Sequence, residues 1–385
     1  MPSSDVIVIG GGFSGVLLTY YLSVTGIRVV LLEAGSLGCG SSGACAGRVQ
    51  LIESETEEYL DLALSGFSRL AATREELEID LEWELPGHIT LLSTIEQWNA
   101  YQERVNCLQR KGIVAEMLDC GTLQKYEPAL SVSGLLGAVY SQEAHLNPFN
   151  FLMGYANAAR RSGATILTQT PVTGFQVENG TILTILSKRE KFVADTVVLA
   201  CGAWTGILAE WAGGELPMRF THAEALVTEP IPRIIHHHVG MAGFYETVHG
   251  NKPTVTLGVG QHPNGTLVVS NAIQQSSEID QASTAWGMPA LSNALKKYFP
   301  ALSQVRVMRT WAAPSPFLPD YLPAVGWLPG FENLFVLAGL HLAIPTVPIL
   351  AEWSAKMVLE RQEIPALSSF SPGRFTSGGN HDKDL

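Results

Sequence analysis

The first thirty residues change from one apolar pattern to another and back. Val6-Ile7-Val8-Ile9 is an unbroken apolar run, which predicts a strand buried on both faces. From Val16 to Thr25 the apolar residues recur at helical spacing, and Ile27 to Leu32 is a second apolar strand. This order predicts a β-strand, helix, β-strand unit at the start of the chain.

The turn between the first strand and the helix is rich in glycine. Gly10-Gly11-Gly12-Phe13-Ser14-Gly15 reads G-x-G-x-x-G, with Gly10 for the tight turn, Gly12 for close approach of a pyrophosphate and Gly15 for helix packing. Glu33 follows the second strand, where a carboxylate accepts hydrogen bonds from ribose hydroxyls. A plain glycine-rich turn is the alternative. The complete unit predicts dinucleotide binding, and Glu33 disfavours NADP.

The rest of the pattern predicts a mixed chain. Residues 55–81 are rich in Glu, Leu and Ala at helical spacing and predict a long helix. Residues 165–202 read as strands, with a hairpin turn at Asn179-Gly180. Residues 219–311 carry β-branched runs typical of a sheet. A strand at 333–339 and a helix from about 346 to 360 follow.

Composition narrows the class of protein. Hydrophobic residues make up 46% of the 385 residues and charged residues 16%, so the chain can bury a large core and is not mostly disordered. The formal net charge is −12, and the sequence contains no run of Lys and Arg residues. These features disfavour binding to nucleic acids and to anionic membrane surfaces.

Two uncharged runs and the cysteines bear on the compartment. Residues 6–27 and 333–351 are long enough to raise the question of a membrane span or signal peptide. Glycines or prolines interrupt both, and no basic stretch precedes the first, so we expect buried elements of a soluble domain. The five cysteines are odd in number and lack metal-ligand spacing. They predict reduced thiols in the cytoplasm, without a disulfide framework or a metal site.

Further motifs have an order typical of one family. A small-residue loop reads GCGSSGACAG at 38–47, and a strand ends as VVLACGAW at 197–204. TWAAPSP at 310–316 precedes PDYLPAVG at 319–326. Together with the N-terminal glycines, these segments resemble the FAD-dependent D-amino acid oxidase/glycine oxidase family, and the resemblance extends from residue 5 to about residue 375.

Within that family, the loop GSSGACAGRVQ is similar to the FAD-bearing B (β) subunits of heteromeric enzymes. These are opine (octopine/nopaline) oxidase, D-hydroxyproline dehydrogenase, hydrogen cyanide synthase and sarcosine oxidase. The resemblance implies a small-molecule amine substrate, a larger α (A) subunit and a small iron–sulfur subunit, in the cytoplasm or peripheral to the inner membrane. FMN and a [2Fe-2S] centre in such a complex would come from outside the motifs of this chain, which has no ferredoxin-like cysteine spacing.

The resemblance also implies the fold. We expect an α/β (overall α+β) chain with a Rossmann-like, glutathione-reductase-type FAD-binding domain and a second, mainly antiparallel-sheet substrate domain. The FAD-binding domain is expected to comprise residues 1–80, 145–218 and 325–385, and the substrate domain residues 81–144 and 219–324. Residues 376–385 are polar and are expected to form a disordered tail.

The chemistry implied by the family is transfer of a hydride from the substrate's α-carbon to flavin N5, which leaves an imine for hydrolysis. The cofactor supplies the reactivity and the protein supplies orientation. The FAD contacts carried over from the family's motifs fall on Gly10, Gly12, Phe13, Ser14, Gly15, Glu33, Ala34, Ser41, Ser42, Ala46, Gly47, Val172, Ala200, Gly202, Trp204, Gly339, Ile344 and Thr346. Cys45 and Cys201 occupy small-residue positions and are expected to pack as inert side chains.

Two departures from the family pattern concern the substrate and the flavin. Ser315 stands where relatives place a carboxylate-binding arginine, while Arg48 follows the loop directly. We therefore hypothesise that Arg48 binds the substrate carboxylate, with a surface or ion-pair arginine as the equal alternative. The segment 339–346 also departs, because Leu340 and Ile344 replace a histidine and a glycine and Pro345 lacks an N–H.

Other polar candidates are weaker. Tyr245 lies where relatives place a tyrosine over the flavin, and we expect it to contact the substrate. His236-His237-His238 has the residue type of a metal cluster. Adjacent side chains in a strand point to opposite faces, so we expect a solvated edge instead.

The sequence therefore predicts an FAD-dependent oxidoreductase acting on CH–NH or CH–NH2 donors. The leading hypothesis is that the chain is the catalytic β (B) subunit of a heteromeric opine oxidase or dehydrogenase. Three alternatives stay open. These are a stand-alone glycine, D-amino acid or sarcosine oxidase, a flavin-bearing structural subunit, which segment 340–346 motivates, and an oxidase of 2-hydroxy acids.

Overall fold

The first strand, β1 (Ser3–Ile9), lies in the middle of a sheet and is covered on both sides. The computed structural model describes residues 3–54, 56–188, 190–243, 252–276, 278–340 and 343–376. Val6 and Val8 pack into one hydrophobic cluster with helix side chains, whereas Ile7 and Ile9 pack into a second cluster on the other face. The unbroken apolar run therefore supplies both faces of a buried strand, as predicted.

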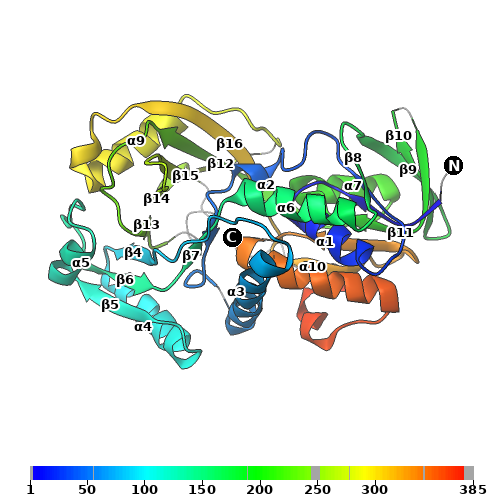
Figure 1. The fold of residues 1–385 in the computed structure, drawn as a ribbon, viewed down its shortest axis with the longest axis horizontal. Helices are drawn as coiled ribbons and strands as arrows, with labels where there is room; N and C mark the ends of the chain where they lie inside the picture. The colour runs from blue at the N-terminus through cyan, green and yellow to red at the C-terminus, as the bar shows by residue number, and fades with distance from the viewer. Residues whose placement is uncertain are drawn as a thin grey trace.

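β1 belongs to a mixed eight-stranded sheet with the path β17-β18-β11-β1-β2-β8 (Figure 1, right). The strands from β18 to β8 are parallel, β17 is antiparallel to β18, and the β9–β10 hairpin extends from β11. The other seven strands are β2 (Val29–Leu32), β8 (Thr165–Leu167), β9 (Val172–Glu178), β10 (Thr181–Ser187), β11 (Lys191–Leu199), β17 (Ala324–Trp327) and β18 (Leu334–Ala338).

A second eight-stranded sheet has the order β16-β12-β15-β14-β13-β4-β6-β5 (Figure 1, left). Its pairs are antiparallel except β13 with β4. Its strands are β4 (His88–Leu92), β5 (Ala115–Asp119), β6 (Gly137–Ser141), β12 (Arg219–Thr228), β13 (His238–Met241), β14 (Thr254–Gln261), β15 (Leu267–Gln275) and β16 (Val307–Phe317). A short ribbon joins β3 (Arg48–Val49) to β7 (Ala144–His145). The predicted α/β class, with a parallel and a largely antiparallel sheet, is confirmed.

Local sequence fixes several helix ends. The Thr56 side chain accepts a hydrogen bond from the Tyr59 amide, and Thr94 with Gln97 forms a capping box. Asn147 caps a helix that begins with Pro148. The helices are α1 (Phe13–Ser23), α2 (Ser41–Ala44), α3 (Glu57–Glu76), α4 (Ile95–Arg110), α5 (Cys120–Tyr126), α6 (Pro148–Arg161), α7 (Thr205–Ala212), α9 (Gly287–Tyr298) and α10 (Ala343–Glu360). Short 3-10 turns span Gly202–Trp204, Pro300–Leu302, Pro365–Phe370 and Pro372–Phe375.

Both sheets are assembled from separated stretches of chain. The mixed sheet takes its strands from residues 3–32, 165–199 and 324–338. The antiparallel sheet takes its strands from 88–141 and 219–317. We propose that the two domains divide at residues 80, 145, 218 and 325, so that each sheet lies in one domain, apart from Ala324 at the start of β17. The expected tail falls almost entirely on 377–385, outside the described residues.

The expectation for the three adjacent histidines is wrong for one of them. β13 is an interior strand between β14 and β4, so His238 is buried. His236 is exposed, and His237 Nδ1 lies 2.8 Å from Glu127 Oε1. Within the described ranges, no group of three or more His, Cys, Asp or Glu side chains has the arrangement of a metal site. Nor does any described helix combine the length and apolar character needed to cross a membrane.

Candidate functional site

A cavity of about 500 Å³ lies between the two sheets. On one side, the last residues of β1, β2 and β18 line it, together with Ala200 just after β11. The carboxyl ends of neighbouring parallel strands are where α/β sheets bind ligands. On the other side, β12, β15 and β16 present mostly small side chains. We call this space the central cavity.

The glycine-rich turn packs so closely that larger residues cannot replace two of its glycines. Gly10 has φ +112°, and a Cβ there would collide with the carbonyl oxygen of Ala200. A Cβ on Gly15 would collide with the carbonyl oxygen of Gly10. Helix α1 therefore starts directly against β1, and its first turn faces the cavity through Gly12, Phe13 and Ser14. Amides in a first helical turn have no intrahelical acceptor and favour anions.

Glu33 is fixed at the end of β2 by backbone amides. Its Oε2 accepts a hydrogen bond from the Gly11 amide at 2.6 Å, and its Oε1 accepts one from the Gly35 amide at 2.6 Å. The side chain is buried and lines the central cavity. A carboxylate has about four lone-pair sites, so Glu33 retains acceptor capacity for a ligand hydroxyl.

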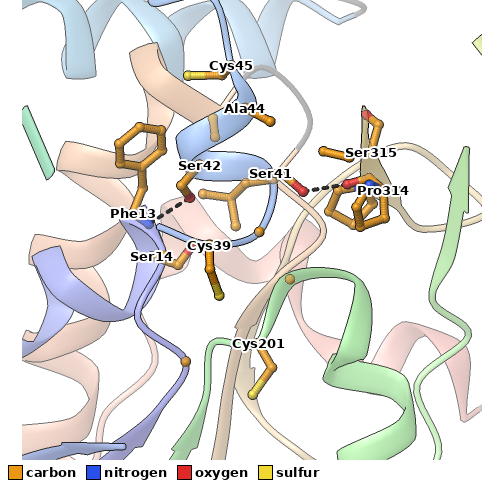
Figure 2. Close-up of a pocket in the computed structure, with 18 of the residues that line it drawn as sticks. Phe13, Ser14, Cys39, Ser41, Ser42, Ala44, Cys45, Cys201, Pro314 and Ser315 are labelled. Atoms are coloured by element: carbon orange, nitrogen blue, oxygen red, sulfur yellow. Dashed lines mark hydrogen bonds between the residues drawn. The ribbon is translucent and has the colours of Figure 1, made fainter. Parts of the chain in front are cut away.

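The small-residue loop is tied to both sheets, as Figure 2 shows for its two serines. Ser42 Oγ accepts a hydrogen bond from the Phe13 amide at 3.0 Å, and Ser41 Oγ donates to the Pro314 carbonyl. Trp311 Nε1 donates to the Ala44 carbonyl at 2.9 Å. The loop is therefore held against α1 on one side and β16 on the other.

Two thiols face the cavity without becoming reactive. Burial raises the pKa of Cys45 to about 11, and burial also raises the pKa of Cys201. Cys201 Sγ donates a hydrogen bond to the Ile9 carbonyl at 3.0 Å. A thiol is nucleophilic only as the thiolate, so both side chains are inert near neutral pH. This agrees with their expected packing role.

These features fit FAD. The glycine turn leaves room for a pyrophosphate at the start of α1, and the Glu33 carboxylate suits a ribose. Small side chains of the 41–47 loop and of β12 and β16 leave space for a flat ring system between the sheets. The residues that would hold the cofactor are therefore mostly the ones expected from the sequence.

Arg48, in the short strand β3, also lines the central cavity. Its guanidinium is half-buried and forms no hydrogen bond or salt bridge with any residue that the structure describes. Burial lowers the pKa of Arg48, and the negative charges of Glu143 and Glu53 act in the opposite direction. An inward guanidinium with free donors is suited to a carboxylate.

Four histidines with lowered pKa values lie near Arg48. The His145 ring stacks on His238 at 5.1 Å and meets His262 edge-on at 4.5 Å. Burial lowers the pKa of His145 to about 4, and burial lowers the pKa of His238, His262 and His88 as well. These rings are therefore uncharged at pH 7 and leave Arg48 as the local cation.

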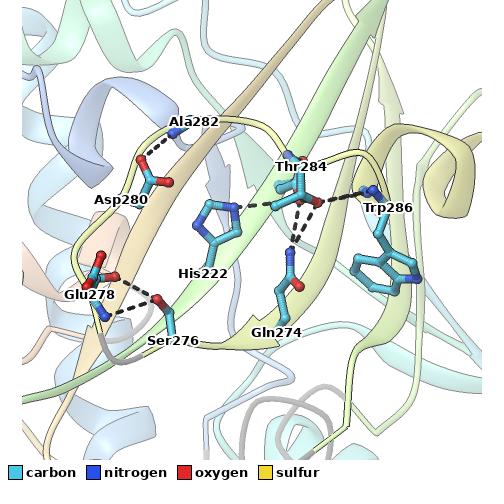
Figure 3. A network of polar contacts seen from close by, with 10 residues as sticks. His222, Gln274, Ser276, Glu278, Asp280, Ala282, Thr284 and Trp286 are labelled. Atoms are coloured by element: carbon cyan, nitrogen blue, oxygen red, sulfur yellow. Dashed lines mark hydrogen bonds and ion pairs between the residues drawn. The ribbon is translucent and has the colours of Figure 1, made fainter.

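A polar network stabilises the loop that leaves β15 (Figure 3). Buried Glu224 accepts hydrogen bonds from the Thr284 hydroxyl and amide and from Gln274, while His222 Nε2 lies 3.6 Å away. Gln281, on the same loop, donates to the Cys39 carbonyl at 2.9 Å. The loop therefore connects the antiparallel sheet to the small-residue loop beside the cavity.

The structure brings most of the expected site residues together around one cavity. Gly15 and Thr346 do not line it, and Thr346 is fully buried in the first turn of α10. Tyr245 lies outside the described residues. The expected residues that line the cavity are Gly10, Gly12, Phe13, Ser14, Glu33, Ala34, Ser41, Ser42, Ala46, Gly47, Arg48, Val172, Ala200, Gly202, Trp204, Ser315, Gly339 and Ile344.

Sequence reasoning missed the contribution of β15. Ser270 and Asn271 both line the cavity, although adjacent residues of a regular strand point to opposite faces. The signal in the sequence is a polar pair that interrupts the apolar run from Leu267 to Ile273. Such a pair does not reveal by itself which face it occupies.

The chain is similar in sequence to known proteins over most of its length. The sequence matches the family described as "DAO: FAD dependent oxidoreductase" over residues 5–357. It is 28% identical to sarcosine oxidase subunit beta of Rhizobium meliloti, covering 88% of this chain and 80% of that protein. It is 26% identical to glycine oxidase of Geobacillus kaustophilus, covering 95% and 96% respectively.

A likeness in fold accompanies the sequence match. The crystal structure of L-proline dehydrogenase from P. horikoshii superposes with a TM-score of 0.87 at 22% identity, covering 98% of this chain and 99% of that one. The predicted enzyme class, an FAD-dependent amine or amino-acid oxidoreductase, is confirmed. The chain belongs to the DAO family of FAD-dependent oxidoreductases.

Proposed function

We propose that this chain is the catalytic, FAD-bearing β subunit of a heteromeric oxidase or dehydrogenase for an opine-like secondary amine. The sarcosine oxidase relative, named as a β subunit, supports both parts of the proposal, because sarcosine is a secondary amine. A larger α subunit and a small iron–sulfur subunit are the proposed partners. FMN and a [2Fe-2S] centre belong to those partners in this proposal.

The observation that carries the proposal is the unpaired guanidinium of Arg48 in the central cavity. A half-buried arginine without a described partner has donors free for a substrate carboxylate. Ser315, where relatives bind the carboxylate with arginine, carries no charge and also lines the cavity. Arg48 thus provides the recognition that Ser315 cannot.

FAD, when bound, supplies the acceptor for the hydride from the carbon beside the amine nitrogen. The chain's residues bind and orient. Arg48 holds the carboxylate, and Glu33 with the α1 turn holds the nucleotide end. Ala223, Ala225 and Ala313 leave a flat, apolar wall that excludes water from the space between them. Tyr245 stays proposed as a substrate contact.

A stand-alone oxidase for a monocarboxylate amine is the second candidate. Among the described residues that line the cavity, Arg48 is the sole cation, which suffices for one carboxylate. An opine has two or more carboxylates, so one of them would have to face solvent or a partner subunit. The glycine oxidase relative, which aligns over 96% of its length, is compatible with this alternative.

The test is anaerobic reduction of the flavin in protein purified from its native source. We expect nopaline or octopine to bleach the flavin absorbance, with two further chains co-eluting. Bleaching by sarcosine or glycine in a single-chain preparation would replace the proposal with the second candidate. A flavin that no amine bleaches would contradict both candidates. The remaining hypotheses would then be oxidation of a 2-hydroxy acid and a purely structural role.

A further inference from the structure

An irregularity in the antiparallel sheet lies at the wall of the central cavity, next to Arg48. In the pairing of β12 with β15, Glu224 lies opposite Ala272 and Ala225 lies opposite Ser270. Asn271 is therefore an extra residue, and β15 bulges there. The backbone of Asn271 has φ +75°, a left-handed conformation that asparagine tolerates better than most residues.

The bulge changes where two side chains point. Ser270 pairs with Ala225, whose side chain faces the cavity, and the extra residue brings Asn271 to the same cavity. A bulge is a common device for re-aiming a side chain beside a functional site. A left-handed backbone at a residue other than glycine costs free energy, and such residues are found preferentially at functional sites.

Three polar side-chain atoms converge at this point. The neighbouring residue on β14 is Gly258, which pairs with Ser270. A Cβ built on Gly258 would lie 2.9 Å from Arg48 Nη2, 3.0 Å from Asn271 Nδ2 and 3.0 Å from Ser270 Oγ. The three atoms therefore lie at most about 6 Å from one another, close enough for the two oxygens of one carboxylate to contact them together, and a side chain at position 258 would crowd all three.

These atoms have little else to bind. Neither the Arg48 guanidinium nor the Asn271 amide forms a hydrogen bond or ion pair with a described residue. Ser270 Oγ makes a long contact of 3.4 Å to the Gly258 carbonyl. The carboxylates of the cavity wall are already bound, since Glu33 accepts from Gly11 and Gly35, and Glu224 accepts from Thr284 and Gln274.

We propose that Asn271 is a specificity-determining residue, which with Ser270 binds the same substrate carboxylate that Arg48 neutralises. The inference rests on the proposed function in one respect, the assignment of that carboxylate to Arg48. Arg48 supplies the positive charge from β3, whereas Asn271 Nδ2 and Ser270 Oγ supply hydrogen bonds from β15. The enzyme therefore selects amines with a free carboxylate over their amides and esters, which cannot accept from all three donors.

The backbone conformation suggests the variants. Asn271→Gly removes the side chain and keeps the left-handed backbone without strain. Asn271→Asp keeps the shape and places a negative charge beside the carboxylate. Asn179→Gly is the matched control, because Asn179 has φ +48° and is exposed. It lies in the β9–β10 turn of the mixed sheet and does not line the cavity.

The experiment titrates acetate into the flavin-loaded full chain, together with whatever subunits co-purify. Binding is followed by the shift of the flavin absorbance and, independently, by the rise in unfolding temperature, with acetamide as the uncharged probe. We expect Asn271→Gly to weaken acetate binding about tenfold and Asn271→Asp at least a hundredfold. Acetamide binding should change little, and Asn179→Gly should behave as wild type.

Arg48→Ala separates the two proposals. If Arg48→Ala loses acetate binding while both Asn271 variants bind acetate like wild type, the role of Asn271 is wrong and the role of Arg48 stands. If Arg48→Ala binds acetate like wild type, the carboxylate assignment itself is wrong. Flavin content measured in every variant shows whether the cavity is intact.

Discussion

Two parts of the central cavity are built by different means: the nucleotide end, formed by the glycine turn and Glu33, and the Arg48 end, formed by Arg48, Ser270 and Asn271. At the nucleotide end, backbone amides, glycines and one carboxylate come from the first 35 residues of the chain. At the Arg48 end, the polar side-chain atoms come from β3 and β15, which are more than 200 residues apart. The first end is a local motif, whereas the second end exists only when distant strands pair.

This contrast separates what is shared with the family from what distinguishes this chain. The nucleotide end has the glycine pattern and the carboxylate expected from the family resemblance, because a pyrophosphate requires close approach of the backbone. The Arg48 end departs from it at Ser315 and Arg48. Substitutions at the first end should therefore act on cofactor content, and substitutions at the second end on substrate affinity.

Gly15→Ala is expected to have the largest effect. The new Cβ would meet the Gly10 carbonyl oxygen, so α1 must move away from β1. We expect loss of bound FAD and a destabilisation of about 3 kcal/mol or more. Flavin absorbance per protein and urea unfolding measure both. Gly174→Ala is the control, since a Cβ there has an ordinary contact of 3.7 Å. Normal flavin content in Gly15→Ala would disprove the tight packing.

Arg48→Ala comes next and should leave cofactor content unchanged. Removing a charged hydrogen-bond donor to a carboxylate costs about 2–3 kcal/mol, which corresponds to a rise in KM of about 30- to 200-fold. Steady-state kinetics with the reducing substrate measure it. Arg309→Ala, an exposed arginine on β16, should leave KM at the wild-type value. An unchanged KM in Arg48→Ala would instead make Arg48 an electrostatic partner of Glu143 and Glu53.

Glu143→Gln should have the smallest effect, and it depends on pH. Burial raises the pKa of Glu143 to about 7, although amides of Leu51 and Ile52 donate to it at 2.8 Å. The folded chain thus holds this proton more tightly than the unfolded chain, so the stability from protonation is lost as pH rises from about 4.5 to 7. Ionised at pH 8, the carboxylate costs at most about 3 kcal/mol.

Unfolding free energies at pH 5 and pH 8 test this expectation. Glu143→Gln should approach wild type at pH 5 and exceed it at pH 8. The lowered pKa of His145 acts in the acid range, but it contributes equally to both proteins. Glu103→Gln, an exposed glutamate on α4, should follow wild type throughout. A constant difference between Glu143→Gln and wild type at both values would contradict the buried ionisation.

The sequence suffices for features in which neighbours along the chain are neighbours in space. The β1–α1–β2 unit, the hairpin at Asn179-Gly180 and the long helix α3 are of this kind. Their strands, turns and caps depend on a few adjacent residues. The same holds for Glu33, whose place follows from the length of one β-strand, helix, β-strand unit.

Pairing between distant strands explains what the sequence does not reveal. Asn271 faces the cavity because β15 gains a residue relative to β12, and no local pattern records that register. His238 is buried because β13 lies between β14 and β4, whereas an isolated strand with three histidines suggests an edge. Arg48 could be proposed from its place after the small-residue loop, but its lack of partners depends on the whole fold.

The interleaving of the two sheets has a consequence for synthesis in the cell. β1 pairs with β11 from Ser3–Val193 to Ile9–Leu199, so the first strand must wait for about 190 further residues. At about 5–20 residues per second, that wait is on the order of 10–40 s on the ribosome. Until then, one edge of an apolar strand has no partner strand. A lower growth temperature or co-expressed chaperones should therefore raise the yield of folded chain. The gain should be larger than for a protein whose strands pair in sequence order.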